Sequence, residues 1–98
     1  MDNADIAAKM TEALVKAGGT AKSVKFDFGD DGQVFASGEE ATTEDNDADC
    51  TISVSKDDFI ALAEGNLDPM MAFMSGKLKV AGDMSVAMGL QSIFSNMN

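Results

Sequence analysis

The chain has 98 residues, enough for one domain (residues 1–98) with a modest core, because folding removes roughly 60–65% of the surface of so short a chain from water. Seventeen acidic residues outnumber seven lysines, with no arginine or histidine, and the formal net charge is −10. Nucleic acid and anionic membrane surfaces repel so acidic a protein. We therefore expect no nucleic-acid partner.

Cysteine content and the first residues indicate a compartment. The single cysteine, Cys50, cannot form an internal disulfide, and residues 1–6 lack the basic start and apolar stretch of a signal peptide. No run reaches the roughly 18 to 20 apolar residues that span a bilayer. These features predict a cytoplasmic protein without stable membrane insertion.

The first elements are a helix and a hairpin. A helix is expected between Asp2 and the glycine pair at 18–19, because apolar residues recur there at helical spacing: Ile6, Met10, Leu14 and Ala17. Residues 24–28 alternate between apolar and charged, residues 29–32 (Gly-Asp-Asp-Gly) form a turn, and residues 33–37 return as a second strand.

An acidic segment separates the hairpin from the next strand. Residues 38–49 hold six carboxylates and no base, which is typical of a solvated loop. Residues 49–55 then place Cys50, Ile52 and Val54 on one face, as a third strand would.

The second half alternates helices with a strand. Ser55 can cap a helix over residues 56–64, and Asp68 followed by Pro69 starts another that ends at Gly76. Residues 77–81 alternate as a fourth strand, and a last helix runs from Met84 to about Phe94. This order predicts an α+β sandwich, in which about four helices cover one face of an antiparallel or mixed sheet of about four strands.

The last helix is apolar over a wide arc. One row consists of Val86, Leu90, Ile93 and Met97, and beside it lie Met84, Ala87, Met88 and Phe94. Such a helix must be buried between two surfaces, cover a ligand or pair with another chain. The methionines at 70, 71, 74, 84 and 88 fit ordinary core packing or the wall of a ligand site, since methionine suits both.

Catalytic and metal motifs are missing from the sequence. There is no histidine for acid–base or metal chemistry, and Cys50 alternates inward on its strand. Residues 45–49 imitate the start of a calcium loop, but Cys50 stands where glycine is needed and Lys56 stands where a bidentate glutamate is needed. We expect no enzyme activity, no metal and no cofactor.

Three segments carry a family resemblance. Residues 48–55, 58–62 and 68–92 closely resemble the sterol carrier protein domain family, and the similarity covers residues 48–94 with the elements in the family's order. The resemblance implies an α+β sandwich whose curved sheet and helices enclose an apolar tunnel. It also implies that sterols, fatty acyl chains or other lipids are bound and moved without chemistry.

The resemblance also implies a set of ligand-binding residues. The strand before Gly82 and the helix from Met84 would wall the tunnel, with Phe59, Leu62, Phe73 and Met74 facing them. The complete set is Phe26, Phe59, Leu62, Met70, Phe73, Met74, Leu78, Val80, Met84, Met88, Leu90, Ile93 and Phe94.

Two departures from the family modify these expectations. Only about six residues separate the first helix from Val24, so an early strand is expected to be missing and the tunnel to be shallow. The chain ends Asn96-Met97-Asn98 without a peroxisomal Ser-Lys-Leu tripeptide, which favours a cytoplasmic form.

Two functions follow. The first is a small carrier for a sterol, fatty acid or other lipid. The alternative is an interaction module with a solid core, whose last helix makes a homodimer or docks onto a partner. Lys77 and Lys79 lie on the strand face opposite Leu78 and Val80, so they are expected to reach solvent rather than the ligand.

Overall fold

The computed structural model describes residues 2–97; the side chains of residues 84, 87, 88, 90 and 91 lie outside the description. In chain order the elements are α1 (Asn3–Ala17), β1 (Thr20–Asp27), the 3₁₀ turn η1 (Gly29–Asp31), β2 (Gln33–Gly38), β3 (Glu40–Thr42), β4 (Cys50–Val54), α2 (Lys56–Ala63), α3 (Pro69–Met74), β5 (Leu78–Gly82) and α4 (Met84–Met97).

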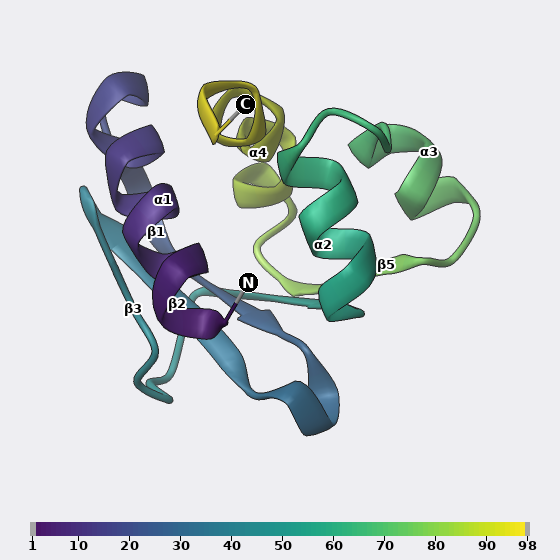
Figure 1. Cartoon of the computed structure of the whole chain (residues 1–98), viewed down its shortest axis with the longest axis horizontal. Coiled ribbons are helices and arrows are strands. Elements are labelled where there is room, and N and C mark those ends of the chain that lie inside the picture. Colours follow the sequence, from purple (N-terminus) through teal and green to yellow (C-terminus); the bar gives the residue numbers. More distant parts are fainter. Residues whose placement is uncertain (1, 98) are drawn as a thin grey trace.

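The strands form one mixed sheet in the order β3-β2-β1-β4-β5. β1 and β4 run parallel, with Phe26 opposite Ile52, and the other neighbouring strands are antiparallel. The helices lie on one face of this sheet (Figure 1). The predicted α+β sandwich with a mixed sheet is therefore confirmed.

The expected strand count was wrong by one. Within residues 2–97 the sheet has five strands, and the additional one is β3, at the start of the acidic segment predicted to be a loop. Its only inward apolar residue is Ala41, whose N–H donates to Thr11 Oγ1 of α1 at 3.0 Å. A three-residue strand with one small inward side chain has too short an alternation to be recognised in sequence.

β1 also begins earlier than expected, at Thr20 rather than Val24. Gly18 ends α1 in the left-handed conformation, with φ of 87°, so the chain turns directly into the sheet. Among the described residues no separate strand lies between α1 and β1, because the short connection to Val24 is itself part of β1, and the fifth strand of the sheet is β3.

The predicted helix starts are confirmed by their caps. The Asp2 carboxylate accepts from the backbone N–H of Asp5, Ser55 Oγ accepts from that of Asp58, and the Asp68 carboxylate accepts from that of Met70. α4 continues to Met97, three residues beyond the expected end.

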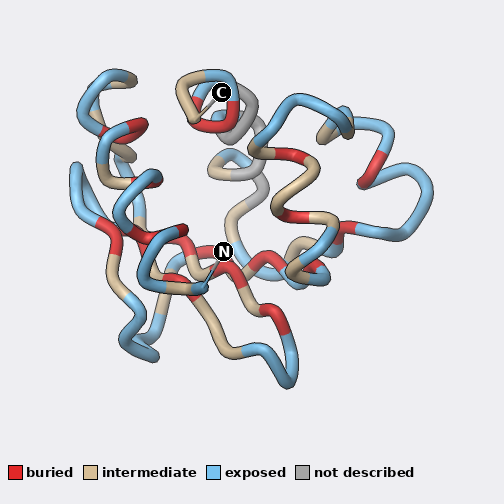
Figure 2. Tube along the Cα trace, viewed as in Figure 1, coloured by how far each residue is buried: buried red, intermediate tan, exposed pale blue. Residues whose placement is uncertain are grey.

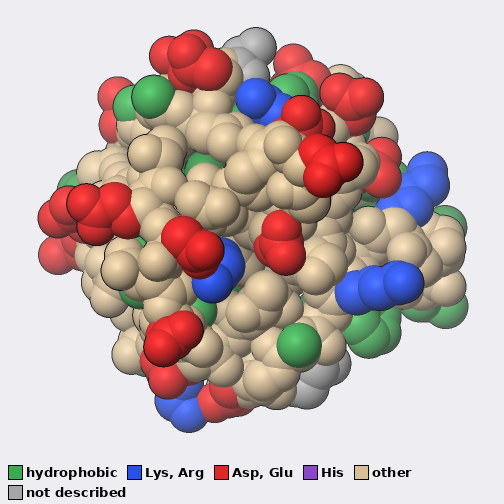
Figure 3. Space-filling model, turned by 90° about the horizontal axis from the view of Figure 1, so that it is seen from below, with side chains coloured by type: hydrophobic (Ala, Val, Ile, Leu, Met, Phe, Trp, Pro, Cys, Tyr) green, Lys and Arg blue, Asp and Glu red, His purple; other side chains and the backbone are tan. Residues whose placement is uncertain are grey.

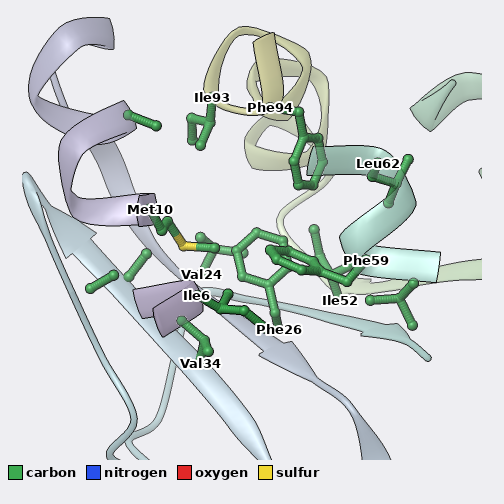
Figure 4. Close-up of a cluster of buried hydrophobic side chains, with 14 of the residues drawn as sticks. Ile6, Met10, Val24, Phe26, Val34, Ile52, Phe59, Leu62, Ile93 and Phe94 are labelled. Carbon is green, nitrogen blue, oxygen red and sulfur yellow. The ribbon is translucent and has the colours of Figure 1, made fainter. Parts of the chain in front are cut away.

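The core lies between the sheet and the helices, where buried segments of both face one another (Figure 2). At its centre the rings of Phe26, Phe59 and Phe94 meet edge to face (Figure 4), with centroids 5.0 Å apart for Phe26–Phe59 and 5.5 Å for Phe59–Phe94. Phe28 adds a tilted contact with Phe59 at 5.2 Å. We call these four residues the phenylalanine cluster; it joins β1, α2 and α4.

Candidate functional site

Two hollows reach the phenylalanine cluster from different sides of α4. The first, which we call the Phe94 hollow, has a volume of about 380 Å³ and lies between α2, the α2–α3 loop and α4; its lining is Leu62, Gly65, Asn66, Leu67, Asp68, Pro69, Phe94 and Ser95. The second, the Phe59 hollow, has a volume of about 330 Å³ and lies between α1, α2 and the end of α4; its lining is Ile6, Lys9, Phe59, Ile60, Ala63, Glu64 and Met97.

Each hollow falls in the lower part of the size range of small-molecule sites, which begins at about 300 Å³. Phe59 lines one and Phe94 lines the other, and these two rings are in contact with each other. The two hollows therefore border the same aromatic pair, one at each ring.

The interior between the hollows is apolar. Every described side chain that is buried is hydrophobic. Lys9, Glu64 and Asp68 line the hollows, but none of these three charged residues is buried. A ligand portion that entered here would find no buried polar partner among the described side chains. It must therefore be apolar, because an unpaired buried polar group costs several kcal/mol, roughly 2–7.

The start of α4 is fixed to the sheet by polar contacts. The Asp83 carboxylate pairs with the Lys22 ammonium of β1 and accepts from the N–H and Oγ of Ser85 at 2.9 and 2.6 Å. The hydrogen bond from Lys22, and then those from Ser85, lower the pKa of Asp83 well below its usual range. The Asp83 N–H also donates to the Asp49 carbonyl at 3.1 Å.

A third hollow lies beside this anchor. It has a volume of about 260 Å³ and is lined by the end of α1, the start of β1 and the first turns of α4, with Lys22, Ser85 and Ser92 among its polar residues. α4 is thus held at its start and bordered by hollows along its length.

The structure buries six of the predicted ligand-binding residues. Phe26, Phe59, Leu62, Leu78, Ile93 and Phe94 are each at most 5% exposed, and Val80 is half-buried against the same core. Met84, Met88 and Leu90 have side chains outside the described residues.

The predicted orientation of α3 was wrong. Met70, Phe73 and Met74 are 67%, 45% and 76% exposed, although Phe73 and Met74 were expected to face the strand and the last helix. α3 has six residues, and it packs with only Ala72 buried, which leaves the other apolar side chains of the helix outside the core.

Sequence reasoning missed several residues that line the hollows, including Ile6, Ala63 and Leu67. The helical spacing had marked Ile6 as inward, but nothing in the sequence states that α1 packs beside α4. Met97 had been placed on the apolar row of the last helix without being assigned to the site.

The part of the chain that the structure describes has neither a metal-binding cluster nor a membrane-spanning helix. Those residues contain no group of three or more histidine, cysteine, aspartate or glutamate side chains placed to hold a metal ion. No helix among them has both the length and the apolar character needed to cross a membrane. The Cys50 thiol is buried, and burial raises its pKa.

Comparison with known sequences gives a family match over nearly the whole chain. The sequence model of the SCP-2 sterol transfer family matches residues 3–95. Sterol carrier protein 2 of Rattus norvegicus is 51% identical over 49 residues, which are 50% of this chain and 9% of that protein. Hydroxysteroid dehydrogenase-like protein 2 of Bos taurus is 49% identical over 51 residues, 52% of this chain and 12% of that protein. The chain thus matches only a small part of these curated relatives.

Comparison with solved structures supports the fold. The solution structure of sterol carrier protein 2 from Aedes aegypti, in complex with the C16 fatty acid palmitate, superposes with a TM-score of 0.78. It is 17% identical in sequence, and the match covers 96% of this chain and 94% of that one.

Proposed function

The chain belongs to the SCP-2 sterol transfer family, and from this premise we propose that it binds and carries an apolar ligand such as a fatty acid, a sterol or another lipid, without catalysis. The palmitate complex of the Aedes aegypti neighbour supports a fatty acyl chain as one candidate. We further propose that the chain acts in the cytoplasm.

The observation that carries the proposal is the contact between Phe59 and Phe94, because Phe59 lines a hollow of about 330 Å³ and Phe94 lines one of about 380 Å³. If either ring turns aside, the hollows join into one apolar channel between the sheet and the helices. An extended acyl chain or a sterol has the elongated shape that such a channel accepts.

The mechanism that we propose is a displacement of the second half of α4. Asp83 holds the start of this helix to β1 through Lys22, whereas Phe94 and Met97 near its end line the two hollows. Movement of the end of α4 would withdraw Phe94 from the cluster and admit the ligand. Uncharged side chains throughout residues 84–98 lower the cost of contact with lipid.

The proposed contacts are the predicted set, divided by position into three groups. Phe26, Phe59, Leu62, Leu78, Val80, Ile93 and Phe94 line the channel; Met84, Met88 and Leu90 belong to the α4 wall; and Met70, Phe73 and Met74 join only if α3 closes over a bound ligand.

Native mass spectrometry of gently purified protein tests the function directly. Co-purifying lipid, identified after organic extraction, is the expected result. A doubled protein mass without lipid would instead favour the interaction module, whose solid core would be the packed phenylalanine cluster.

A ligand titration supplies the second test. Saturation at one hundred times the dissociation constant stabilises the folded state by about 2.7 kcal/mol, which for a domain of this size raises the melting temperature by about 10 °C or more. No shift with any member of a fatty acid and sterol series would count strongly against a binding site.

A further inference from the structure

α3 exposes an apolar surface that the rest of the chain leaves uncovered. Its side chains Met70, Met71, Phe73 and Met74 are 67%, 62%, 45% and 76% exposed, and we call these four residues the α3 patch. Their helix packs mainly on β5, through Ala72. Adjacent exposed apolar side chains of this size mark contact sites more often than scattered single ones do.

The charge around the α3 patch differs from that of the remaining molecule. Residues 69–82 contain two lysines, Lys77 and Lys79, and no acidic residue, whereas sixteen of the seventeen acids precede residue 69. Both lysines are exposed on or beside β5, directly after α3. In Figure 3, lysine and hydrophobic side chains gather together at the edge where α3 and β5 lie in Figure 1.

The acids nearest this surface lie at its borders. Asp68 caps α3 and is engaged by the N–H groups of Met70 and Met71, and Asp27 shares a shallow hollow with Lys77 and Lys79. Residues 69–82 carry no carboxylate of their own, so an anionic surface can approach this face without meeting a row of carboxylates on it.

A lipid surface suits this combination better than a second copy of the chain. A two-fold interface would place the same patch on both sides and so bring the lysines of both copies together. At a lipid surface, flexible methionine and phenylalanine side chains enter the boundary layer while lysine stems extend along it and keep their ammonium groups at the head groups.

We propose that α3 and the start of β5 form a shallow, reversible docking surface for lipid bilayers with anionic head groups. The strong negative charge elsewhere repels the bilayer and so orients the protein with this face toward it. The Phe94 hollow includes Asp68 and Pro69 at the start of α3, so docking places that hollow beside the bilayer. Docking itself does not depend on ligand binding.

Vesicle flotation at low salt tests the proposal, with vesicles of phosphatidylcholine alone and of phosphatidylcholine mixed with phosphatidylglycerol. The wild-type chain should float with the mixed vesicles and should be released by raised salt. Met71→Ser combined with Met74→Ser should weaken binding, and Lys77→Gln combined with Lys79→Gln should weaken it about thirtyfold, since the two lysines near an anionic surface together contribute about 2 kcal/mol.

Matched controls come from α1, on the other side of the molecule. Val15→Ser removes an exposed apolar side chain, one that is 56% exposed, outside the α3 patch. Lys16→Glu, at the end of α1, makes the same change of two units in net charge as the β5 pair and touches neither hollow. Both controls should bind mixed vesicles as the wild type does, which distinguishes a local surface from a general effect of charge or hydrophobicity.

Three results would overturn the proposal. The first is wild-type protein that does not bind the mixed vesicles, and the second is patch variants that bind as well as the α1 controls. The third is a wild-type dimer in sedimentation that the two methionine substitutions dissociate, because the patch would then be a protein interface. None of these results bears on co-purified lipid, so the carrier function stands or falls separately.

Discussion

Phe59 of α2 and Phe94 of α4 pack edge to face with ring centroids 5.5 Å apart, and each ring borders a hollow that the other does not. This pair therefore belongs to the core and also borders both hollows. Aromatic pairs of this geometry contribute about 0.5–1.5 kcal/mol beyond the area that they bury. A ligand that displaces Phe94 must replace those contacts, which is possible for an apolar chain and not for a charged one.

Phe94→Ala should lower the stability of the free protein and enlarge its response to ligand. Truncation of a buried phenylalanine costs about 3–5 kcal/mol, because it removes contacts and leaves a cavity. Here the cavity would join the two hollows, so a fatty acid should restore more of the melting temperature in the variant than it adds to the wild type. Thermal melts with and without palmitic acid measure both effects.

The control for this variant is Val34→Ala. Val34 is fully buried on β2, and it lines neither hollow. Its truncation should destabilise the fold while leaving the ligand-induced shift as in the wild type. Equal shifts for the Phe94 and Val34 variants would show that Phe94 does not limit the ligand space.

Local signals in the sequence predicted most elements, and three-dimensional contacts account for what they missed. Asp2, Ser55 and Asp68 mark helix starts because the cap is made within three residues of each. β3 escaped notice because Ala41 is held in place by Thr11, thirty residues away. The Phe59 hollow depends on α1 packing against α4, a contact that no local pattern encodes.

The methionines show a second limit of sequence reasoning. Met10 lies on α1, which has 15 residues, and Met70 lies on α3, which has 6; Met10 is fully buried and Met70 is 67% exposed. Periodicity assigns a residue to a face of its own helix, but whether that face meets the sheet depends on how the helix is placed. For a six-residue helix such as α3, the loops decide this placement.

Gly82→Ala should destabilise the joint between β5 and α4. Gly82 has φ of 101°, and a Cβ there would lie 2.4 Å from the Asp49 carbonyl oxygen. The strained backbone alone costs about 1–3 kcal/mol, and the clash would also disturb the Asp83–Asp49 contact that anchors α4. Chemical denaturation measures the loss.

Gly89→Ala is the matched control for Gly82→Ala. Gly89 lies within α4, and a Cβ there would meet nothing within 4 Å. The substitution should therefore stabilise the helix by about 0.5–1 kcal/mol, because alanine loses less conformational freedom than glycine on folding. A loss of stability at Gly89 comparable with that at Gly82 would contradict the steric explanation.

The Lys22–Asp83 pair should make part of the stability depend on pH. The folded-state pKa of Asp83 is lowered, so its contribution is fully present above the unfolded value near 4 and is lost as the pH falls further. Asp83→Asn should melt below the wild type at pH 7, and the difference should shrink at pH 3. Asp30→Asn, in the exposed η1 turn, serves as the control and should show no such convergence. A constant gap for the Asp83 variant across this range would rule out the ionic contribution.

The positions of the lysines predict which lipid head groups the protein prefers. Tight binding of coenzyme A phosphates normally requires arginine or a cluster of lysines. This sequence has no arginine. Lys77 and Lys79 are exposed on the side of β5 opposite buried Leu78. The carboxylates of residues 39–49 add repulsion. We expect uncharged or weakly anionic lipids to bind better than the coenzyme A ester of the same chain. Displacement of a fluorescent fatty acid at moderate salt measures the order, and an ester that displaced the probe about tenfold better than the neutral lipid, a gain of about 1.4 kcal/mol, would refute it.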